Sequence, residues 1–189
     1  MGRWVVVGAN RGIGLELCRQ AQARGETVVA ACRRPTPELE ELGCEILDGV
    51  DVGGEEAVTR LAGIAGPVDV VVANAGILER TGFDAEGREA ALRQFAVNTL
   101  GPLRVVEALL PRLEAGAKIA FVSSKAGSIG DGPSGGMYGY RMSKAALNMA
   151  GANLARELAP RGIHVAILHP GYVRTGMTGG GGTVDPDES

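Results

Sequence analysis

Six short apolar runs recur along the chain, and none of them alternates with polar residues. Runs of Val, Ile and Ala of this length are typical of strands that are covered on both faces, as in a parallel sheet. Amphipathic stretches between them predict helices, and this alternation predicts a doubly wound α/β fold. The expected strands are residues 3–7, 27–31, 45–47, 68–73, 118–122 and 164–168, and the expected helices are 12–24, 38–42, 54–65, 88–114 and 138–160.

Length and composition narrow the class of protein. The chain has 189 residues, of which 45% are hydrophobic and 22% charged, which suffices for the core of one domain. A disordered chain, a collagen and a disulfide-stapled miniprotein are excluded. The formal charge of −3 argues against nucleic acid or an anionic membrane surface as the main partner. No apolar run approaches the ~18 residues of a membrane span and no signal peptide is visible, so we expect a cytoplasmic protein.

Cysteine and histidine give no sign of a metal site. Cys18, Cys32 and Cys44 show no C-x-x-C or Cys/His ligand spacing, and we expect three reduced, buried thiols. His164 and His169 lie in or after an apolar run and are interpreted as structural.

The first expected strand runs into a glycine-rich turn, and a helix follows. Glycines there let the chain bend sharply and let backbone N–H groups approach a pyrophosphate at the helix N-terminus. The spacing is G-x-x-x-G-x-G, not the common G-x-G-x-x-G, so a plain connection stays the alternative. The turn reads Gly8-Ala9-Asn10-Arg11-Gly12-Ile13-Gly14.

The end of the second expected strand bears on the choice of dinucleotide. An NAD site places a carboxylate there for the ribose 2′-OH. Here Cys32, Arg33 and Arg34 stand at that place, and the first acid is Glu38. A guanidinium can bind a 2′-phosphate, and Arg11 could approach the same group. We therefore favour NADP(H) over NAD(H), the alternative being two solvated arginines in a loop.

Tyr140 and Lys144 share one face at the start of a predicted helix. A tyrosine with its ordinary pKa of about 10 is a poor base at neutral pH. A neighbouring ammonium and a positively charged nicotinamide ring would lower that pKa, and Tyr140 could then act as general acid or base. Tyr138, whose i+4 partner is Met142, lacks the lysine. A Y-x-x-x-K spacing alone is weak, because it arises often by chance.

Two further features could belong to the same site. Ser123 and Ser124 follow an expected strand, where a hydroxyl can bond a substrate oxygen or merely cap a loop. The expected helix 88–114 contains Asn98 and then Pro102, which has no N–H to offer the Asn98 carbonyl. A kink there could hold an ordered water beside the Asn98 amide, or be an ordinary proline kink.

In order and spacing, these motifs together resemble the short-chain dehydrogenase/reductase family over residues 3–177. The resemblance is far more specific than any single motif. The residues that carry it are Gly8-x-x-x-Gly12-Ile13-Gly14, Asn74-Ala75-Gly76, Asn98, Ser124, Tyr140-x-x-x-Lys144 and Pro170-Gly171.

The resemblance implies a Rossmann fold, an NADP(H) cofactor and a carbonyl or alcohol substrate. Asn98, Ser124, Tyr140 and Lys144 match the catalytic positions, and Tyr140 and Lys144 would also contact the cofactor. The family also implies a homodimer or homotetramer, commonly through the helices at 88–114 and 138–160. The other implied cofactor contacts are Asp51 and Val52 for the adenine, Asn74, Ala75 and Gly76 for support, and Pro170, Gly171, Val173 and Thr175 for the nicotinamide.

Within the family, residues 124–148 are most similar to the C-factor and sniffer-like carbonyl reductases. The interval between Ser124 and Tyr140 is long and glycine-rich, which predicts a mobile loop at the substrate mouth. An NADPH-dependent carbonyl reductase is the leading hypothesis, and an NAD(P)-binding signalling or regulatory protein is the alternative. The glycines of that interval are Gly127, Gly130, Gly132, Gly135 and Gly136.

The end of the chain departs from the family pattern. Family members continue after Thr175 through a substrate-covering helical segment, a seventh strand and a last helix. Here residues 176–189 are a glycine-rich stretch, which we expect to be a flexible tail beyond a single domain at 1–175. The seventh strand and last helix are expected to be missing, either because this sequence is clipped or because this is a truncated form with an open pocket and one exposed sheet edge. Met137 and Met177 are the candidate apolar contacts of the pocket.

Overall fold

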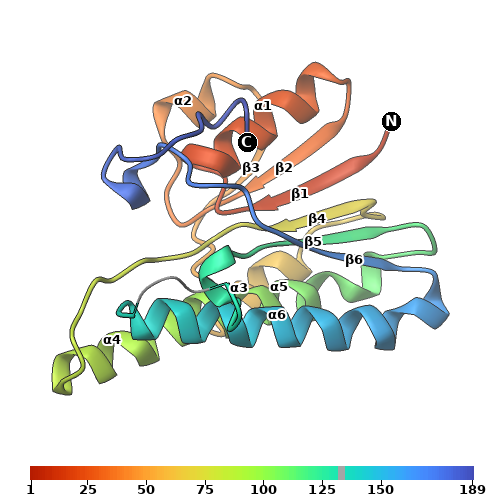
Figure 1. Cartoon of the computed structure of the whole chain (residues 1–189). Coiled ribbons are helices and arrows are strands. Elements are labelled where there is room, and N and C mark those ends of the chain that lie inside the picture. The colour runs from red at the N-terminus through yellow and green to blue at the C-terminus, as the bar shows by residue number, and fades with distance from the viewer. Residues whose placement is uncertain (132–134) are drawn as a thin grey trace.

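The structure is a computed structural model that describes residues 1–131 and 135–189. Its centre is a sheet of six parallel strands in the order β3-β2-β1-β4-β5-β6 (Figure 1). The expected doubly wound fold is thereby confirmed. The strands are β1 (Arg3–Val7), β2 (Thr27–Ala31), β3 (Glu45–Leu47), β4 (Val70–Ala73), β5 (Lys118–Val122) and β6 (His164–Leu168).

Helices cover both faces of the sheet. In Figure 1, α1 and α2 lie above it, and the remaining helices lie below it. The strand order reverses between β1 and β4, which is where open α/β sheets bind ligands at the carboxyl ends of their strands. The helices are α1 (Gly12–Ala23), α2 (Pro37–Glu40), α3 (Glu56–Ala62), α4 (Ala85–Phe95), α5 (Gly101–Leu109) and α6 (Tyr138–Leu158).

The helix expected over 88–114 is interrupted, and this corrects our prediction. A π-helical turn, Ala96–Leu100, separates α4 from α5, and the Gly101 N–H donates to the Ala96 carbonyl. Pro102 stands in the first turn of α5, where a missing N–H costs little. The proline therefore begins a new helix after a widened turn and does not kink a continuous one.

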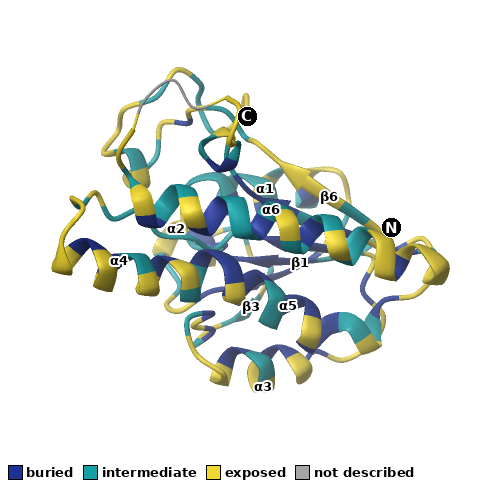
Figure 2. Ribbon diagram, turned by 60° about the horizontal axis from the view of Figure 1, so that its bottom comes forward, coloured by how far each residue is buried: buried dark blue, intermediate teal, exposed yellow. Residues whose placement is uncertain are grey.

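Two apolar clusters fill the space on either side of the sheet. The larger cluster lies under the sheet and includes Phe121, Ile119 and Leu109. The smaller one lies between the sheet and α1 and includes Cys18 and Cys32. These two cysteines are buried and free as expected, whereas Cys44 is half-buried. Figure 2 shows the alternation of buried and exposed positions along α4, α5 and α6.

Residues 176–189, for which we expected a flexible tail, fold back on the segment after β6. Val173 and Val184 form an isolated bridge. The Arg174 N–H donates to the Val184 carbonyl at 2.9 Å, and the Arg174 guanidinium pairs with Asp185 at 2.8 Å. No helix in the described part of the chain is long and apolar enough to cross a membrane.

The core makes a direct prediction about stability. Leu109 on α5 is fully buried in the larger cluster. Leu109→Ala should lower the free energy of unfolding by about 2–5 kcal/mol, because it removes buried methyl groups and leaves a cavity. Ile129→Ala, in the segment before α6 where the side chain is 96% exposed, should change it by less than about 0.5 kcal/mol. Urea unfolding of both variants measures this, and equal losses would contradict the assignment of the core.

Candidate active site

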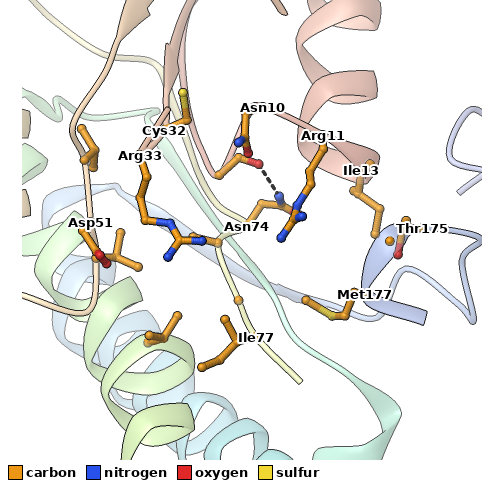
Figure 3. Close-up of a pocket in the computed structure, with 18 residues that line it drawn as sticks. Asn10, Arg11, Ile13, Cys32, Arg33, Asp51, Asn74, Ile77, Thr175 and Met177 are labelled. Atoms are coloured by element: carbon orange, nitrogen blue, oxygen red, sulfur yellow. Dashed lines mark hydrogen bonds between the residues drawn. The ribbon is translucent and has the colours of Figure 1, made fainter. Parts of the chain in front are cut away.

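A pocket opens at the carboxyl ends of β1, β2 and β4, where the strand order reverses (Figure 3). It is lined by most of the positions expected to hold a cofactor and by six that were not expected. The expected ones are Gly8, Asn10, Arg11, Gly12, Ile13, Arg33, Asp51, Val52, Asn74, Ala75, Gly76 and Thr175; the others are Cys32, Val50, Ile77, Val97, Gly176 and Met177.

The glycine turn forms the floor of the pocket, and side chains at its glycine positions would clash with neighbouring atoms. Gly8 has a φ of +86°, and a Cβ there would lie 2.7 Å from the Ala75 Cα. A Cβ on Gly14 would lie 2.1 Å from the Gly8 carbonyl oxygen, which accepts a hydrogen bond from Asn74 Nδ2 at 2.9 Å. No side chain caps the N-terminus of α1, so its first N–H groups can meet an anion. The turn therefore fits a pyrophosphate.

The adenosine side of the pocket is rich in guanidinium groups. Asn10, Arg11, Arg33, Arg34, Gly49 and Asp51 surround one recess, and Figure 3 shows Arg11 and Arg33 extending into the same space. Asn10 Nδ2 donates to the Arg34 carbonyl at 3.0 Å, which ties the turn to the segment after β2. Within residues 1–131 and 135–189, none of these three arginines forms an ion pair.

The residues expected to be catalytic gather at the ends of β5 and α6. Ser124 follows β5; its hydroxyl accepts from the Ala126 N–H at 3.1 Å and lies near enough to the Tyr140 phenol to affect its pKa. Lys144 Nζ lies 5.8 Å from the centre of the Tyr140 ring and donates to the Val122 carbonyl at 2.8 Å. Ser123, the other candidate hydroxyl, instead contacts Asn148 on α6 at 2.5 Å. Of the two serines, Ser124 is therefore the one that faces Tyr140.

The protonation of Tyr140 is set mainly by its burial. Burial raises the pKa of Tyr140, and the hydrogen bond with Ser124 opposes this only in part. Burial also lowers the pKa of Lys144 to about 8. Desolvation of the phenolate is the largest cause of the raised Tyr140 pKa. Tyr140 is therefore held as the neutral phenol, the form that donates a proton. The expected lowering by the ammonium together with a positively charged nicotinamide ring stays a prediction.

Asn98 is fully buried in the π-helical turn and joins two segments. Its Oδ1 accepts from the Ile77 N–H at 2.8 Å, and its Nδ2 donates to the Ile77 carbonyl at 2.9 Å and to Ser143 Oγ at 3.0 Å. Ser143 Oγ donates in turn to the Tyr140 carbonyl at 2.8 Å. The amide thus connects the loop after β4 to the start of α6. That Asn98 also holds a water stays a prediction.

The segment after β6 contributes unevenly to the pocket. Thr175, Gly176 and Met177 line it, and the Thr175 methyl lies 3.1 Å from where a Cβ on Gly12 would stand. Pro170, Gly171 and Val173 do not line it, and Val173 is buried against the folded-back tail.

Both histidines, expected with a buried strand, are exposed, and His169 Nδ1 accepts from the Lys125 N–H at 3.3 Å.

The glycine-rich interval before α6 is described only in part, because Gly132 lies outside the described residues. Gly127 ends a 3₁₀ turn, Lys125–Gly127, directly after Ser124. Met137 precedes α6 with a left-handed φ of 48°, and its sulfur lies 3.6 Å from Arg80 Nη1. The expected mobility of this interval stays a prediction.

Sequence reasoning missed groups that act through their position in the fold. Ile77 contacts Asn98 through its backbone, for which the sequence holds no signal. Ser143 lies three residues after Tyr140, so the helical spacing could have placed it on the same face as Tyr140. Met177 follows Thr175 closely and was expected only as a substrate contact.

Among the described residues, no cluster of His, Cys, Asp or Glu could hold a metal ion.

The lowered pKa of Lys144 predicts how stability depends on pH. Its pKa is about 8 in the folded chain against an ordinary value of 10.5. Between these values the unfolded chain binds more protons, so this group makes the protein more stable as pH rises. Relative to Lys144→Met, the wild-type free energy of unfolding should rise by about 2 kcal/mol from about pH 7.5 to about pH 9.5. Urea unfolding at both pH values measures it, and a constant difference would contradict the burial of a charged amine.

Comparison with known proteins places this geometry in a family. The family model for short chain dehydrogenase matches residues 3–183. A 1-hydroxy-2-glutathionyl-2-methyl-3-butene dehydrogenase of Rhodococcus sp. (strain AD45) is 42% identical over 94% of this chain and 80% of its own length. The C-signal of Myxococcus xanthus is 45% identical over 66% of this chain and 76% of its own length.

A solved structure agrees with these relatives. The NADPH-bound carbonyl reductase from chicken fatty liver superimposes with a TM-score of 0.87 and 30% identity, covering 99% of this chain and 87% of that one. The expected resemblance to C-factor and to NADPH carbonyl reductases is thereby confirmed. The chain belongs to the short-chain dehydrogenase/reductase family.

Proposed function

We propose that the protein is an NADP(H)-dependent carbonyl reductase that reduces a ketone or an aldehyde. One observation carries this proposal. The Ser124 hydroxyl and the Tyr140 phenol, with Lys144 beside the Tyr140 ring, stand at the same edge of the sheet as the glycine-turn pocket, and Lys144 Nζ lies 3.8 Å from where a Cβ on Gly76 of that pocket would stand. A proton donor and a dinucleotide site that meet at one place suit hydride transfer to a carbonyl.

The pocket offers a place for each part of the cofactor. The glycine turn would hold the pyrophosphate, Arg11 and Arg33 the 2′-phosphate, and Asp51 with Val52 the adenine. Lys144 and Tyr140 would contact the nicotinamide ribose. When bound, NADPH supplies the hydride that reduces the carbonyl carbon. The remaining contacts would come from Asn10, Gly12, Ile13, Asn74, Ala75, Gly76 and Thr175, whereas Pro170, Gly171 and Val173, which the family resemblance assigned to the nicotinamide, stand outside the lining of this pocket.

The protein's own side chains would donate the proton and stabilise the negative charge that develops on the substrate oxygen. The Ser124 hydroxyl donates a hydrogen bond to the substrate oxygen as negative charge develops on it. Tyr140 gives that oxygen its proton, and the raised pKa of Tyr140 keeps the proton available. Lys144, with a pKa of about 8, can return a proton near neutral pH, with Asn98 and water completing the relay.

The preference for NADP(H) is supported by charge. Three arginines surround the adenosine recess, and Asp51 is the one carboxylate among its lining residues. A 2′-phosphate would add two negative charges where guanidinium groups can each form charge-assisted hydrogen bonds. The NADPH bound by the similar carbonyl reductase from chicken agrees with this preference.

A second candidate is a signalling or regulatory protein that binds the dinucleotide while its catalysis is incidental. The similarity of this chain to the C-signal of Myxococcus xanthus favours this candidate. The complete set of Asn98, Ser124, Tyr140 and Lys144 argues against it, because a binding protein needs no proton donor. Turnover of a carbonyl substrate distinguishes the two.

We also propose that the protein is cytoplasmic and forms a homo-oligomer through the outer face of α4 and α6. Large apolar side chains are exposed on both helices, which pack beside each other (Figure 2). Leu92 and Phe95 lie on α4, and Met142 and Met149 lie on α6.

The catalytic proposal predicts the effect of removing one hydroxyl. Tyr140→Phe should lower kcat for NADPH-dependent carbonyl reduction by about 10²–10⁴-fold, because it removes the general acid. Tyr138→Phe, two residues away and half exposed beside Phe83, should leave kcat nearly unchanged. Steady-state kinetics over a panel of ketones and aldehydes measures both. Full turnover by Tyr140→Phe would overturn the proposal.

The cofactor proposal predicts a change of preference. Arg33→Asp should reduce the ratio of kcat/KM for NADPH to that for NADH by about 10-fold or more, since a hydrogen bond to a charged group contributes about 1.5–3 kcal/mol. Arg24→Asp, an equal charge change after α1 and outside the pocket, is the matched control and should leave the ratio unchanged. An unchanged ratio in Arg33→Asp would refute the assignment of the 2′-phosphate to this recess.

A further inference from the structure

The loop after β3 and the π-helical turn touch each other closely. A Cβ on Gly101, just after the turn, would lie 2.9 Å from Val52 Cγ2 and 3.2 Å from the Val52 carbonyl oxygen. A Cβ on Gly53 would lie 3.3 Å from Val97 Cγ2. The pocket wall expected to face the adenine and the turn that carries Asn98 are therefore in direct contact.

Arg104, on the first turns of α5, holds these two segments together. Its Nη1 donates to the Val52 carbonyl at 3.1 Å and to the Ala96 carbonyl at 3.3 Å. Its Nε donates to Glu55 Oε1 at 2.8 Å. The Arg104 side chain is only 14% exposed, so most of it is withdrawn from water to make these contacts. One guanidinium thus reaches an acceptor in the loop and another in the turn.

The Ala96 carbonyl is the acceptor that defines the widened turn. It already accepts from the Gly101 N–H, the bond that closes the π-helical turn. Such turns are rare, and they occur frequently at functional sites. The second donor, Arg104, stabilises the widened form from outside the helix. In this way Arg104 helps to fix the turn in which Asn98 and Thr99 stand.

The other side of the turn is bonded to the helix that carries Tyr140. Asn98 Nδ2 donates to Ser143 Oγ, and Thr99 Oγ1 donates to the Ser143 carbonyl at 2.8 Å. Ser143 lies between Tyr140, whose carbonyl it bonds, and Lys144. Asn98 also holds both backbone groups of Ile77. A displacement of the turn would therefore shift Tyr140, Lys144 and the loop after β4.

We propose that Arg104 is a positioning residue that couples the adenine side of the pocket to the catalytic cluster. The Val52 and Ala96 carbonyls, bonded to one guanidinium, transmit the position of the loop to the turn and from there to Ser143. This inference rests on the proposed function for its kinetic consequence, and on the geometry alone for its structural one. Loss of Arg104 should lower kcat as well as raise the KM for NADPH.

The competing explanation is an ordinary surface ion pair between Arg104 and Glu55. The Glu55 side chain is 79% exposed, and such pairs contribute little to stability. The two explanations predict different results for Glu55→Gln, which removes the charge of the partner and keeps both carbonyl contacts. Coupling through the carbonyls predicts that Glu55→Gln behaves as wild type, and a simple ion pair predicts that it behaves as Arg104→Met.

The test compares Arg104→Met with a matched control in the full chain. Arg161 also donates to two carbonyls, those of Leu110 and Leu113 at 3.3 Å each, at the far end of α5. Arg104→Met should speed amide hydrogen exchange of Ile77 by about 10-fold or more, since that N–H is held by Asn98. It should also lower kcat by about 10-fold or more and weaken NADPH binding, whereas Arg161→Met should change none of these.

The results for further variants decide whether Arg104 acts as a positioning residue. Arg104→Lys, which can reach one carbonyl at a time, should recover part of the kcat if positioning is the role. Unchanged Ile77 exchange in Arg104→Met, or equal changes in Arg161→Met, would overturn the proposal. Should Arg104→Met fail to fold, the comparison of Arg104→Lys with Glu55→Gln gives the same decision. Wild-type protein that turns over no carbonyl would refute the proposed function, while Ile77 exchange would still test the coupling.

Discussion

All six strands run in the same direction, and this constraint decides at which edge of the sheet the candidate site lies. The carboxyl ends of parallel strands meet at one edge of the sheet, so residues far apart in sequence reach the same crevice. Gly8 follows β1, Arg33 follows β2, Asn74 follows β4 and Ser124 follows β5. The sheet supplies the rigidity, and the short segments after each strand supply the chemistry.

Beneath that edge, the polar groups that hold the cluster together are buried and bonded. Asn98, Thr99, Ser143 and Lys144 are all withdrawn from solvent, and each has a hydrogen-bond partner. An unpartnered polar group at such a place would cost about 1–3 kcal/mol, so these bonds specify a single arrangement. The same burial that fixes the geometry also sets the acidity. It lowers the pKa of Lys144 and raises that of Tyr140.

The sequence predicts well whatever depends on local patterns. The apolar runs place five of the six strands to the residue. For the central strands the reason is that a strand covered on both faces needs a continuous apolar segment, whereas β6, expected to be covered in the same way, is largely exposed. The glycine turn and the spacing from Tyr140 to Lys144 are likewise local, and the fold brings both to the crevice. The resemblance to the family assigns Asn98 and Ser124 to the candidate site. Taken singly, each of these residues also had an ordinary structural explanation.

What the sequence could not predict depends on contacts between distant segments. A proline in a helical stretch predicts a break, but the contacts that this turn makes with Val52 and Arg104 join distant segments and leave no signal in the sequence. The direction of the Tyr140 pKa follows from burial, which depends on the whole fold. Arg104 itself stands among many arginines in the sequence, and only its three acceptors single it out.

Gly14 limits how this sequence can change over time. The smallest possible side chain at that position would place a carbon 2.1 Å from the Gly8 carbonyl oxygen, closer than any real contact. Gly25, at the end of the same helix, has nothing within 4 Å of its Cβ position, although its φ of +80° still favours glycine. Glycine is thus required by crowding at position 14 and only favoured by backbone conformation at position 25. Relatives of this protein can therefore vary at position 25 through residues such as Asn, while position 14 has no neutral alternative.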